Sequence, residues 1–167
     1  MSAAQDHDEG SFSFAMGDFE ANFPTDRSFA KNHMWAKLHA NAGSESLWRF
    51  GLTEYAVRLL QDVYFLEWES DPPAVVGMRQ MIGAIESKKA ESDLYAPVAG
   101  TLVAINDDVL SDPSVINADC YEQAWLIEMS LTAESASALL TPDAYREHLS
   151  EAWEVAQRTI KGQANVE

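Results

Sequence analysis

The segment Met81–Gly100 reads MIGAIESKKAESDLYAPVAG, and its middle is the most informative part of the chain. Apolar residues dominate its two ends, Met81–Ile85 and Leu94–Val98, and a charged stretch, Glu86–Asp93, separates them. If the two ends pair as antiparallel strands, the charged stretch must reverse the chain and carry its two lysines near the turn. The segment therefore predicts a hairpin that presents an amine.

The same stretch has a second interpretation as an exposed helical turn. Glu86 and Lys89, and likewise Lys88 and Glu91, are spaced so that opposite charges would meet on a helix. The stretch also lacks the Gly or Asn that tight hairpin turns favour. Adjacent lysines among acids are common on solvated surfaces, so the local pattern leaves both interpretations open.

Short apolar runs separated by turn-rich connections continue from His33 to about Ser130 and predict a mainly β domain, a sandwich or barrel. One run, Val63–Trp68, is nearly all apolar, as expected of a strand covered on both faces. A short helix capped by Thr53 is predicted between the strands. The other predicted strands are Met34–His39, Leu47–Phe50, Met81–Ile85, Leu94–Val98, Leu102–Ile105 and Trp125–Met129.

The last element is predicted to be an amphipathic helix. Thr141 can cap it, Pro142 suits its first turn, and Gly162 is expected to end it. Apolar residues recur on one face at helical spacing, and this stripe is expected to pack on the sheet. The stripe comprises Tyr145, Leu149, Trp153, Ala156 and Ile160.

The chain of 167 residues has a net charge of −16, from 27 acidic and 11 basic side chains. A polyanion repels phosphate backbones, so nucleic acid is not an expected partner, and basic protein surfaces are favoured. No apolar run approaches the roughly 18 residues of a membrane-spanning helix, so no membrane association is expected. Cys120 is the only cysteine, and the acidic N-terminus lacks the features of a targeting peptide. Both observations favour the cytoplasm.

Residues 1–26 are predicted to form an acidic arm that precedes the domain. The chain up to about Gly10 is expected to be disordered because it has little apolar surface to bury. The aromatic residues that follow are expected to anchor the arm on the domain rather than to recruit a partner. They are Phe12, Phe14, Phe19, Phe23 and Phe29.

The run Ile85–Gly100 resembles the lipoylation hairpin of glycine cleavage H proteins. That family has Glu-Ser-Val-Lys-Ala, then Ser-Asp, then Ser-Pro and a glycine, with lipoate on the lysine. The resemblance implies lipoate attached covalently to Lys89, and a glutamate recognised by the attaching enzymes at Glu86. The other matched positions, implied to serve in recognition or in stabilising the arm, are Ser87, Ala90, Asp93 and Gly100.

The resemblance extends over roughly residues 27–150. Asn32–Trp35 is similar to the family's His-Glu-Trp opening, and Phe50–Ala56 to its Val-Gly-Ile-Thr-Asp-Tyr-Ala. It implies a flattened barrel-sandwich of the biotinyl and lipoyl type over residues 27–140, with a short internal helix. The C-terminal helix, residues 141–162, would then pack on that domain.

The resemblance also implies a non-catalytic carrier. Its lipoyl arm would shuttle an aminomethyl group and reducing equivalents between a pyridoxal-phosphate glycine decarboxylase, an aminomethyltransferase and dihydrolipoyl dehydrogenase, after loading by a lipoate-attaching enzyme. Two alternatives stay open: an H-like lipoyl donor or carrier for another pathway, and an unmodified interaction module on the same scaffold. A biotin carrier is set aside because such proteins flank their lysine with methionines, whereas Lys88 and Ala90 stand here.

Two departures from the family pattern bear on this function. Lys88 replaces an apolar residue beside the modified lysine and leaves the register of attachment open. Met34 replaces the glutamate of His-Glu-Trp, which in the family holds the amine of the loaded arm together with the aspartate matching Asp93. We expect the loss of this acid to weaken storage of the loaded arm unless Glu54 or Glu91 compensates.

Overall fold

The computed structural model describes residues 10–166, with side chains as far as Arg158. None of the described helices is long and apolar enough to cross a membrane. In chain order the described elements are β1 (Ser11–Met16), β2 (Phe19–Pro24), β3 (Ser28–Phe29), β4 (Met34–Ala42), β5 (Glu45–Leu52), α1 (Glu54–Leu60), β6 (Val63–Trp68), β7 (Ala74–Val76), β8 (Met81–Ser87), β9 (Glu91–Tyr95), β10 (Gly100–Ile105), α2 (Asp107–Ser111), α3 (Val115–Ala118), β11 (Ile127–Leu131), α4 (Ala133–Ala136) and α5 (Pro142–Val166).

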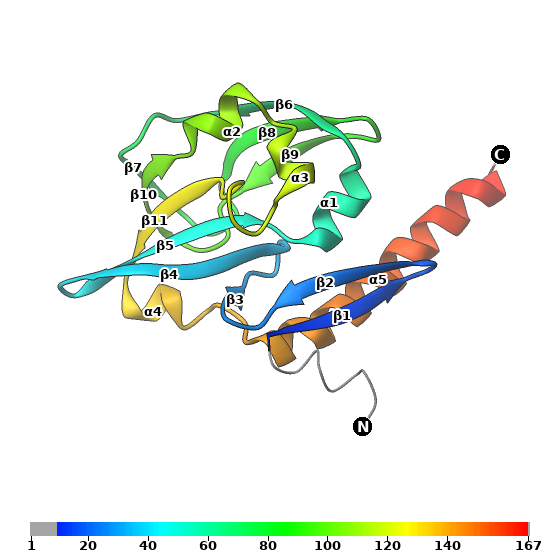
Figure 1. Cartoon of the computed structure of the whole chain (residues 1–167), viewed down its shortest axis with the longest axis horizontal. Helices are drawn as coiled ribbons and strands as arrows, with labels where there is room; N and C mark the ends of the chain where they lie inside the picture. Colours follow the sequence, from blue (N-terminus) through cyan, green and yellow to red (C-terminus); the bar gives the residue numbers. More distant parts are fainter. Residues whose placement is uncertain (1–9, 167) are drawn as a thin grey trace.

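Two sheets form the body of the molecule (Figure 1). One has six strands in the order β3-β4-β5-β11-β10-β7, and the other has three in the order β6-β8-β9. Neighbouring strands in both sheets pair in antiparallel fashion. The predicted mainly β sandwich with a short internal helix is therefore confirmed, and Thr53 caps α1 by accepting a hydrogen bond from the amide of Ala56.

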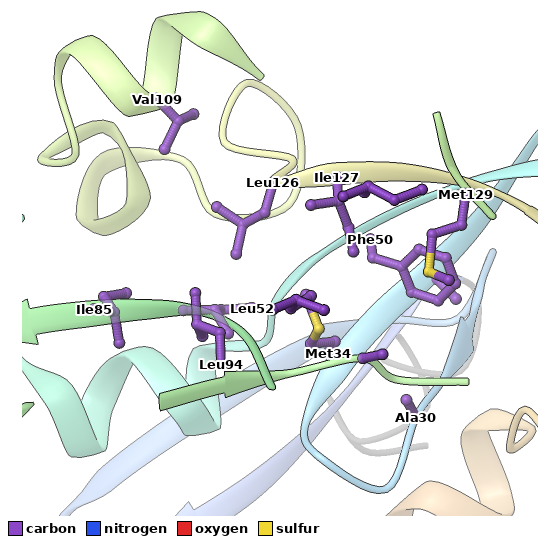
Figure 2. Packing of buried hydrophobic residues seen from close by; sticks show 14 of the residues in the cluster. Ala30, Met34, Phe50, Leu52, Ile85, Leu94, Val109, Leu126, Ile127 and Met129 are labelled. Atoms are coloured by element: carbon purple, nitrogen blue, oxygen red, sulfur yellow. The ribbon is translucent and has the colours of Figure 1, made fainter. Parts of the chain in front are cut away.

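The core fills the space between the two sheets. Figure 2 shows Phe50 and Ile127 from the larger sheet near Leu52, with Ile85 and Leu94 from the smaller one. All five are at most 8% exposed. Burial of each such side chain contributes roughly 1.5–3 kcal/mol, so this shared cluster holds the two sheets together.

The prediction that Val63–Trp68 is covered on both faces is wrong. In β6, Val63 and Leu66 are buried, whereas Tyr64 and Phe65 are 62% and 39% exposed. The three-stranded sheet packs against the core with one face only, and the register of β6 on β8 shifts between Val63 and Phe65. The exposed face therefore carries aromatic residues that the sequence pattern predicts to be buried.

The acidic arm forms a hairpin of β1 and β2. Phe12 and Phe23 are 2% and 0% exposed and stack with ring centroids 4.9 Å apart, while Phe14 and Phe19 are partly buried. These aromatic residues join the arm to Phe29 and to α5 in a second apolar cluster. The disorder expected for the first residues falls on positions 1–9, which lie outside the described residues.

Helix α5 begins at Pro142 as predicted, but Gly162 does not end it, and the helix continues to Val166. A glycine in a helix interior costs only about 1 kcal/mol, and good helix formers follow it. The stripe lies against the arm hairpin and the edge strand β3 rather than across the sheet. Tyr145 and Leu149 are fully buried there, and Tyr145 stacks on Phe29 at 4.5 Å. The side chain of Ile160 lies outside the described part.

His33 lies between the domain and this second cluster. Its φ of 72° is in the left-handed region, and its Nδ1 is 2.8 Å from the hydroxyl of Tyr145. Its ring also contacts those of Tyr55 and His148, at 4.5 and 5.1 Å between centroids. Burial, followed by the charge of His148, lowers the pKa of His33 to about 4.

This histidine makes the fold sensitive to acid. In the unfolded chain His33 takes up a proton near pH 6.5, whereas in the folded chain its pKa is about 4. The contribution of the neutral imidazole to the free energy of unfolding is therefore complete above pH 6.5 and is lost as the pH falls towards 4. We expect His33 to lower the free energy of unfolding by about 3 kcal/mol between pH 6.5 and pH 4. Urea unfolding of wild type and His33→Asn near pH 7 and about pH 4.5 measures it, because asparagine tolerates the positive φ. Parallel losses in the two proteins would contradict the assignment.

Candidate functional site

The charged stretch forms the turn of a hairpin. Glu86 pairs with Glu91, and residues 88–90 connect β8 to β9. The hairpin interpretation is confirmed and the helical-turn interpretation is wrong. Strand β9 begins at Glu91 rather than at the predicted Leu94, because pairing with β8 continues through the charged residues. The turn is the end of the green hairpin in Figure 1.

Ser87 organises this turn from inside. Ser87 as a whole is only 5% exposed. Its Oγ accepts hydrogen bonds from the amides of Lys89 and Ala90, at 3.3 and 3.1 Å, and donates to the carbonyl of Ala90. The amide of Ser87 also donates to that carbonyl, at 2.8 Å. A serine hydroxyl thus supplies the turn contacts that Gly or Asn would otherwise favour.

A hydrogen bond to the residue before β6 fixes the backbone that carries the two lysines. The amide of Lys88 donates to the carbonyl of Asp62 at 2.8 Å and ties the turn to the start of β6. Both lysine side chains are exposed. Within residues 10–158, neither forms an ion pair, so the Glu86–Lys89 and Lys88–Glu91 pairs are not made. An exposed, unpaired amine on a fixed turn is accessible to an acylating enzyme.

Carboxylates gather on the solvent face of the three-stranded sheet. Glu86 lies between Phe65 of β6 and Glu91 of β9 in one row across the sheet. In the next row Ala84 lies between Glu67 and Asp93. The hairpin thus presents an acidic face to which Glu86 and Asp93 belong, with the exposed Phe65 beside Glu86.

A groove opens beyond the far end of β9, and we call it the Tyr95 groove. Its volume is about 500 Å³. The side-chain amide of Asn32 donates to the carbonyl of Tyr95 at 3.0 Å, and the hydroxyl of Tyr95 donates to Asp93 at 3.4 Å. The groove is lined by Ala30, Lys31, Asn32, Met78, Arg79, Tyr95, Ala96, Pro97, Val98, Ala138 and His148.

Gly100 lies apart from the turn, at the start of β10. A Cβ there would meet the side chain of Leu131 at 2.7 Å and the carbonyl of Ser130 at 2.8 Å. Close approach of β10 and β11 therefore requires this glycine. Its contacts are those of packing rather than of the turn.

Met34 is 2% exposed and belongs to the core between the sheets. Neither it nor the two possible compensating acids line the groove. Glu54 accepts a hydrogen bond from the amide of Asn22 at 2.8 Å and so contacts the arm hairpin instead. Glu91 lies at the start of β9, next to the turn. The groove lining thus offers no carboxylate.

Sequence reasoning missed the residues of the Tyr95 groove. They come from five segments of the chain, which no local pattern connects: around Lys31, around Arg79, Tyr95–Val98, at Ala138 and at His148 on α5. His148 reaches the groove through a 2.8 Å contact between its Nε2 and the carbonyl of Lys31. Arg79 has a left-handed φ of 66°. An arginine in the sequence does not predict such a backbone conformation, so this feature could be seen only in the folded chain.

The model of the family "Glycine cleavage H-protein" matches residues 27–152. The glycine cleavage system H protein of Methylacidiphilum infernorum is 34% identical over 134 residues, which are 78% of this chain and 98% of that protein. A probable H protein of Natronomonas pharaonis is 35% identical over 127 residues, 76% of this chain and 96% of its own length.

A solved structure agrees with these sequence matches. The crystal structure of a glycine cleavage system H protein from Mycobacterium marinum superposes with a TM-score of 0.57 at 32% identity. The match covers 69% of this chain and 97% of that one. The arm hairpin β1–β2 precedes the residues matched by the family model.

We expect Ser87→Ala to loosen the turn, because three hydrogen bonds of its hydroxyl are lost from a buried position. The cost should be about 1–2 kcal/mol in the free energy of unfolding. Amide hydrogen exchange at Lys89 and Ala90 should also accelerate. Ser92→Ala is the matched control, since Ser92 lies exposed in the same hairpin. Equal exchange rates in the two variants would show that the hydroxyl does not hold the turn.

Proposed function

The chain belongs to the glycine cleavage H-protein family, whose members are lipoyl carriers, and we propose that Lys89 carries the lipoate here. The observation that supports this most directly is the exposed, unpaired amine of Lys89 on a turn held by Ser87 and Asp62. The chain's own contribution is positioning. It fixes the base of the arm and leaves its amine in solvent, where another protein can reach it.

The attaching enzyme would recognise the hairpin by its carboxylates. Glu86 is half-buried in the sheet, so its position relative to the turn is fixed, and Glu91 lies directly opposite. A basic surface on the enzyme can pair with these acids while Phe65 offers an apolar contact.

We further propose the family's full cycle for this chain. Lipoate held on Lys89 would supply a disulfide able to accept an aminomethyl group together with two electrons, and its partners would be a pyridoxal-phosphate glycine decarboxylase, an aminomethyltransferase and dihydrolipoyl dehydrogenase. The acidic character of the chain, −16 overall, favours transient encounters with basic surfaces on these enzymes. The single cysteine, which is buried, is compatible with a reducing cytoplasm.

A second function is favoured by one observation, the burial of Met34. The family position that supplies a carboxylate to the loaded arm here packs in the core. A carrier without this acid could serve as a lipoyl donor or carrier in another pathway. The aminomethyl cycle remains the first proposal because the hairpin, apart from Lys88, matches the family and includes Asp93.

We expect Lys89→Arg to abolish lipoylation, because arginine keeps the charge but offers no acylable amine. Intact mass and fragment mass spectrometry of protein made in lipoate-fed cells measure it. The matched control is Lys88→Arg, which should retain the lipoyl increment on Lys89. Modification that persists in Lys89→Arg and disappears in Lys88→Arg would move the site by one residue, and no increment in wild type would favour an unmodified interaction module.

Reconstitution decides between the two pathways. The lipoylated protein, mixed with the decarboxylase, the aminomethyltransferase, the dehydrogenase and tetrahydrofolate, should release ammonia in a glycine-dependent manner. Lys89→Arg provides the blank for this assay. Lipoylated protein that releases no ammonia would leave Lys89 as the carrier site and replace the aminomethyl cycle with the second function.

A further inference from the structure

The edge strands of the described sheets differ in how they are protected from pairing with another chain. An edge is commonly blunted by shortness, charge, a bulge or a covering element. The edges β3 and β7 have two and three residues, β9 carries Glu91 and Asp93, and β6 contains a register shift. The outer edge of β2 is covered, because the amide of Asn22 donates to Glu54 at 2.8 Å and its carbonyl accepts the hydroxyl of Tyr121.

Strand β1 lacks each of these protections. It runs for six residues, Ser11–Met16, and its sequence SFSFAM contains no charged residue, proline or glycine. Figure 1 shows it as the outer strand of the arm hairpin, on the side away from the two sheets, with α5 behind the hairpin. An uncharged edge of this length is the kind to which a further strand can add.

The backbone groups of Ser13 point out of the arm hairpin. Ser13 lies opposite Asn22, which turns both of its backbone groups away from β1 through the two contacts given above. Opposite residues of an antiparallel pair direct their backbone groups either both inward or both outward, so Ser13 also directs its N–H and C=O outward. The alternation gives Ser11 and Ala15 the same orientation. Within the described residues, no hydrogen bond to these outward groups is formed.

The sequence of β1 is complementary to itself in one antiparallel register. A two-fold axis at Ser13 would set this residue opposite its own counterpart, so that the outward N–H of each copy donates to the outward C=O of the other. The same register would set Phe12 opposite Phe14 of the second copy, on the face of the strand that packs with α5. Phe14 is only partly buried in the single chain, so it would gain cover from this pairing.

We propose that β1 is an association surface for a second copy of this chain, which adds its own β1 in antiparallel register about Ser13 and joins the two arm hairpins into one sheet. A second copy is the favoured occupant because it brings a matching uncharged strand, whereas an edge without acids offers no attraction to a basic one. Each copy carries a net charge of −16, so the pair should be weak and should tighten when salt screens the repulsion.

This association is independent of the proposed lipoate. Strand β1 precedes the residues matched by the family model. Figure 1 places it on the opposite side of the molecule from β8 and β9. The lysine turns of both copies would therefore stay accessible in the pair.

Sedimentation equilibrium of the full chain tests the proposal. At about 200 µM protein and about 0.5 M salt, the apparent mass of wild type should approach twice the 18.5 kDa of one chain. The association constant should rise about ten-fold between about 0.05 and 0.5 M salt. Hydrogen exchange at the amide of Ser13 should slow over the same range of protein concentration, because that amide becomes a donor in the pair.

Two substitutions at Ser13 should keep the protein monomeric. Ser13→Lys would place two ammonium groups directly opposite one another in the pair, although it lowers the net negative charge of each chain. Ser13→Pro would remove the outward N–H without removing a hydrogen bond of the hairpin. Asn22→Lys is the matched control, since it makes the same change of charge at an exposed position of β2, and it should associate like wild type. Urea unfolding shows that each variant is folded.

Wild type that stays monomeric at every concentration overturns the proposal, and slow exchange at Ser13 in that monomer would show that the chain itself covers the edge. Association that persists unchanged in folded Ser13→Lys and Ser13→Pro would place the contact on another surface. Equal loss of association in Asn22→Lys would show an effect of charge rather than of the β1 edge. None of these results depends on whether Lys89 is lipoylated, so the proposed function is tested separately.

Discussion

The hydroxyl of Ser87 is the contact on which the site depends, because it converts a stretch of charged residues into a defined turn. The hydroxyl forms hydrogen bonds with the backbone of Lys89 and Ala90 in the turn. The hydrogen bond from the amide of Lys88 to the carbonyl of Asp62 ties the turn to the start of β6. A carrier needs a mobile arm on an immobile base. These few hydrogen bonds supply the base, while the lysine side chain stays free in solvent.

The sandwich behind the turn gives each strand of the small sheet one face in the core and one in water. The inner residues, such as Ile85 and Leu94, fix the register. The outer ones then fall into rows that combine Phe65 with Glu86 and Glu91. The ordered rows of acidic and aromatic side chains on the hairpin are therefore a by-product of the hydrophobic alternation that builds the core.

Much of the fold could be predicted because short apolar runs, a capped helix and a helical stripe are local signals. The hairpin turn was harder, since its geometry comes from a buried serine rather than from Gly or Asn. The exposure of Tyr64 depends on a register shift, and the direction of the α5 stripe depends on the arm hairpin being present to receive it. The Tyr95 groove was out of reach, because Lys31, Arg79 and His148 meet only through tertiary structure.

The arm hairpin and α5 come from opposite ends of the chain and bury one another, with Phe12, Phe23 and Tyr145 in a single cluster. This pairing imposes an order on biosynthesis. The phenylalanines of the arm leave the ribosome well before α5 and stay unburied until that helix emerges, whereas β8 and β9 can pair in the meantime. The β8–β9 hairpin is thus complete on a nascent polypeptide in which the arm hairpin and α5 have not yet met.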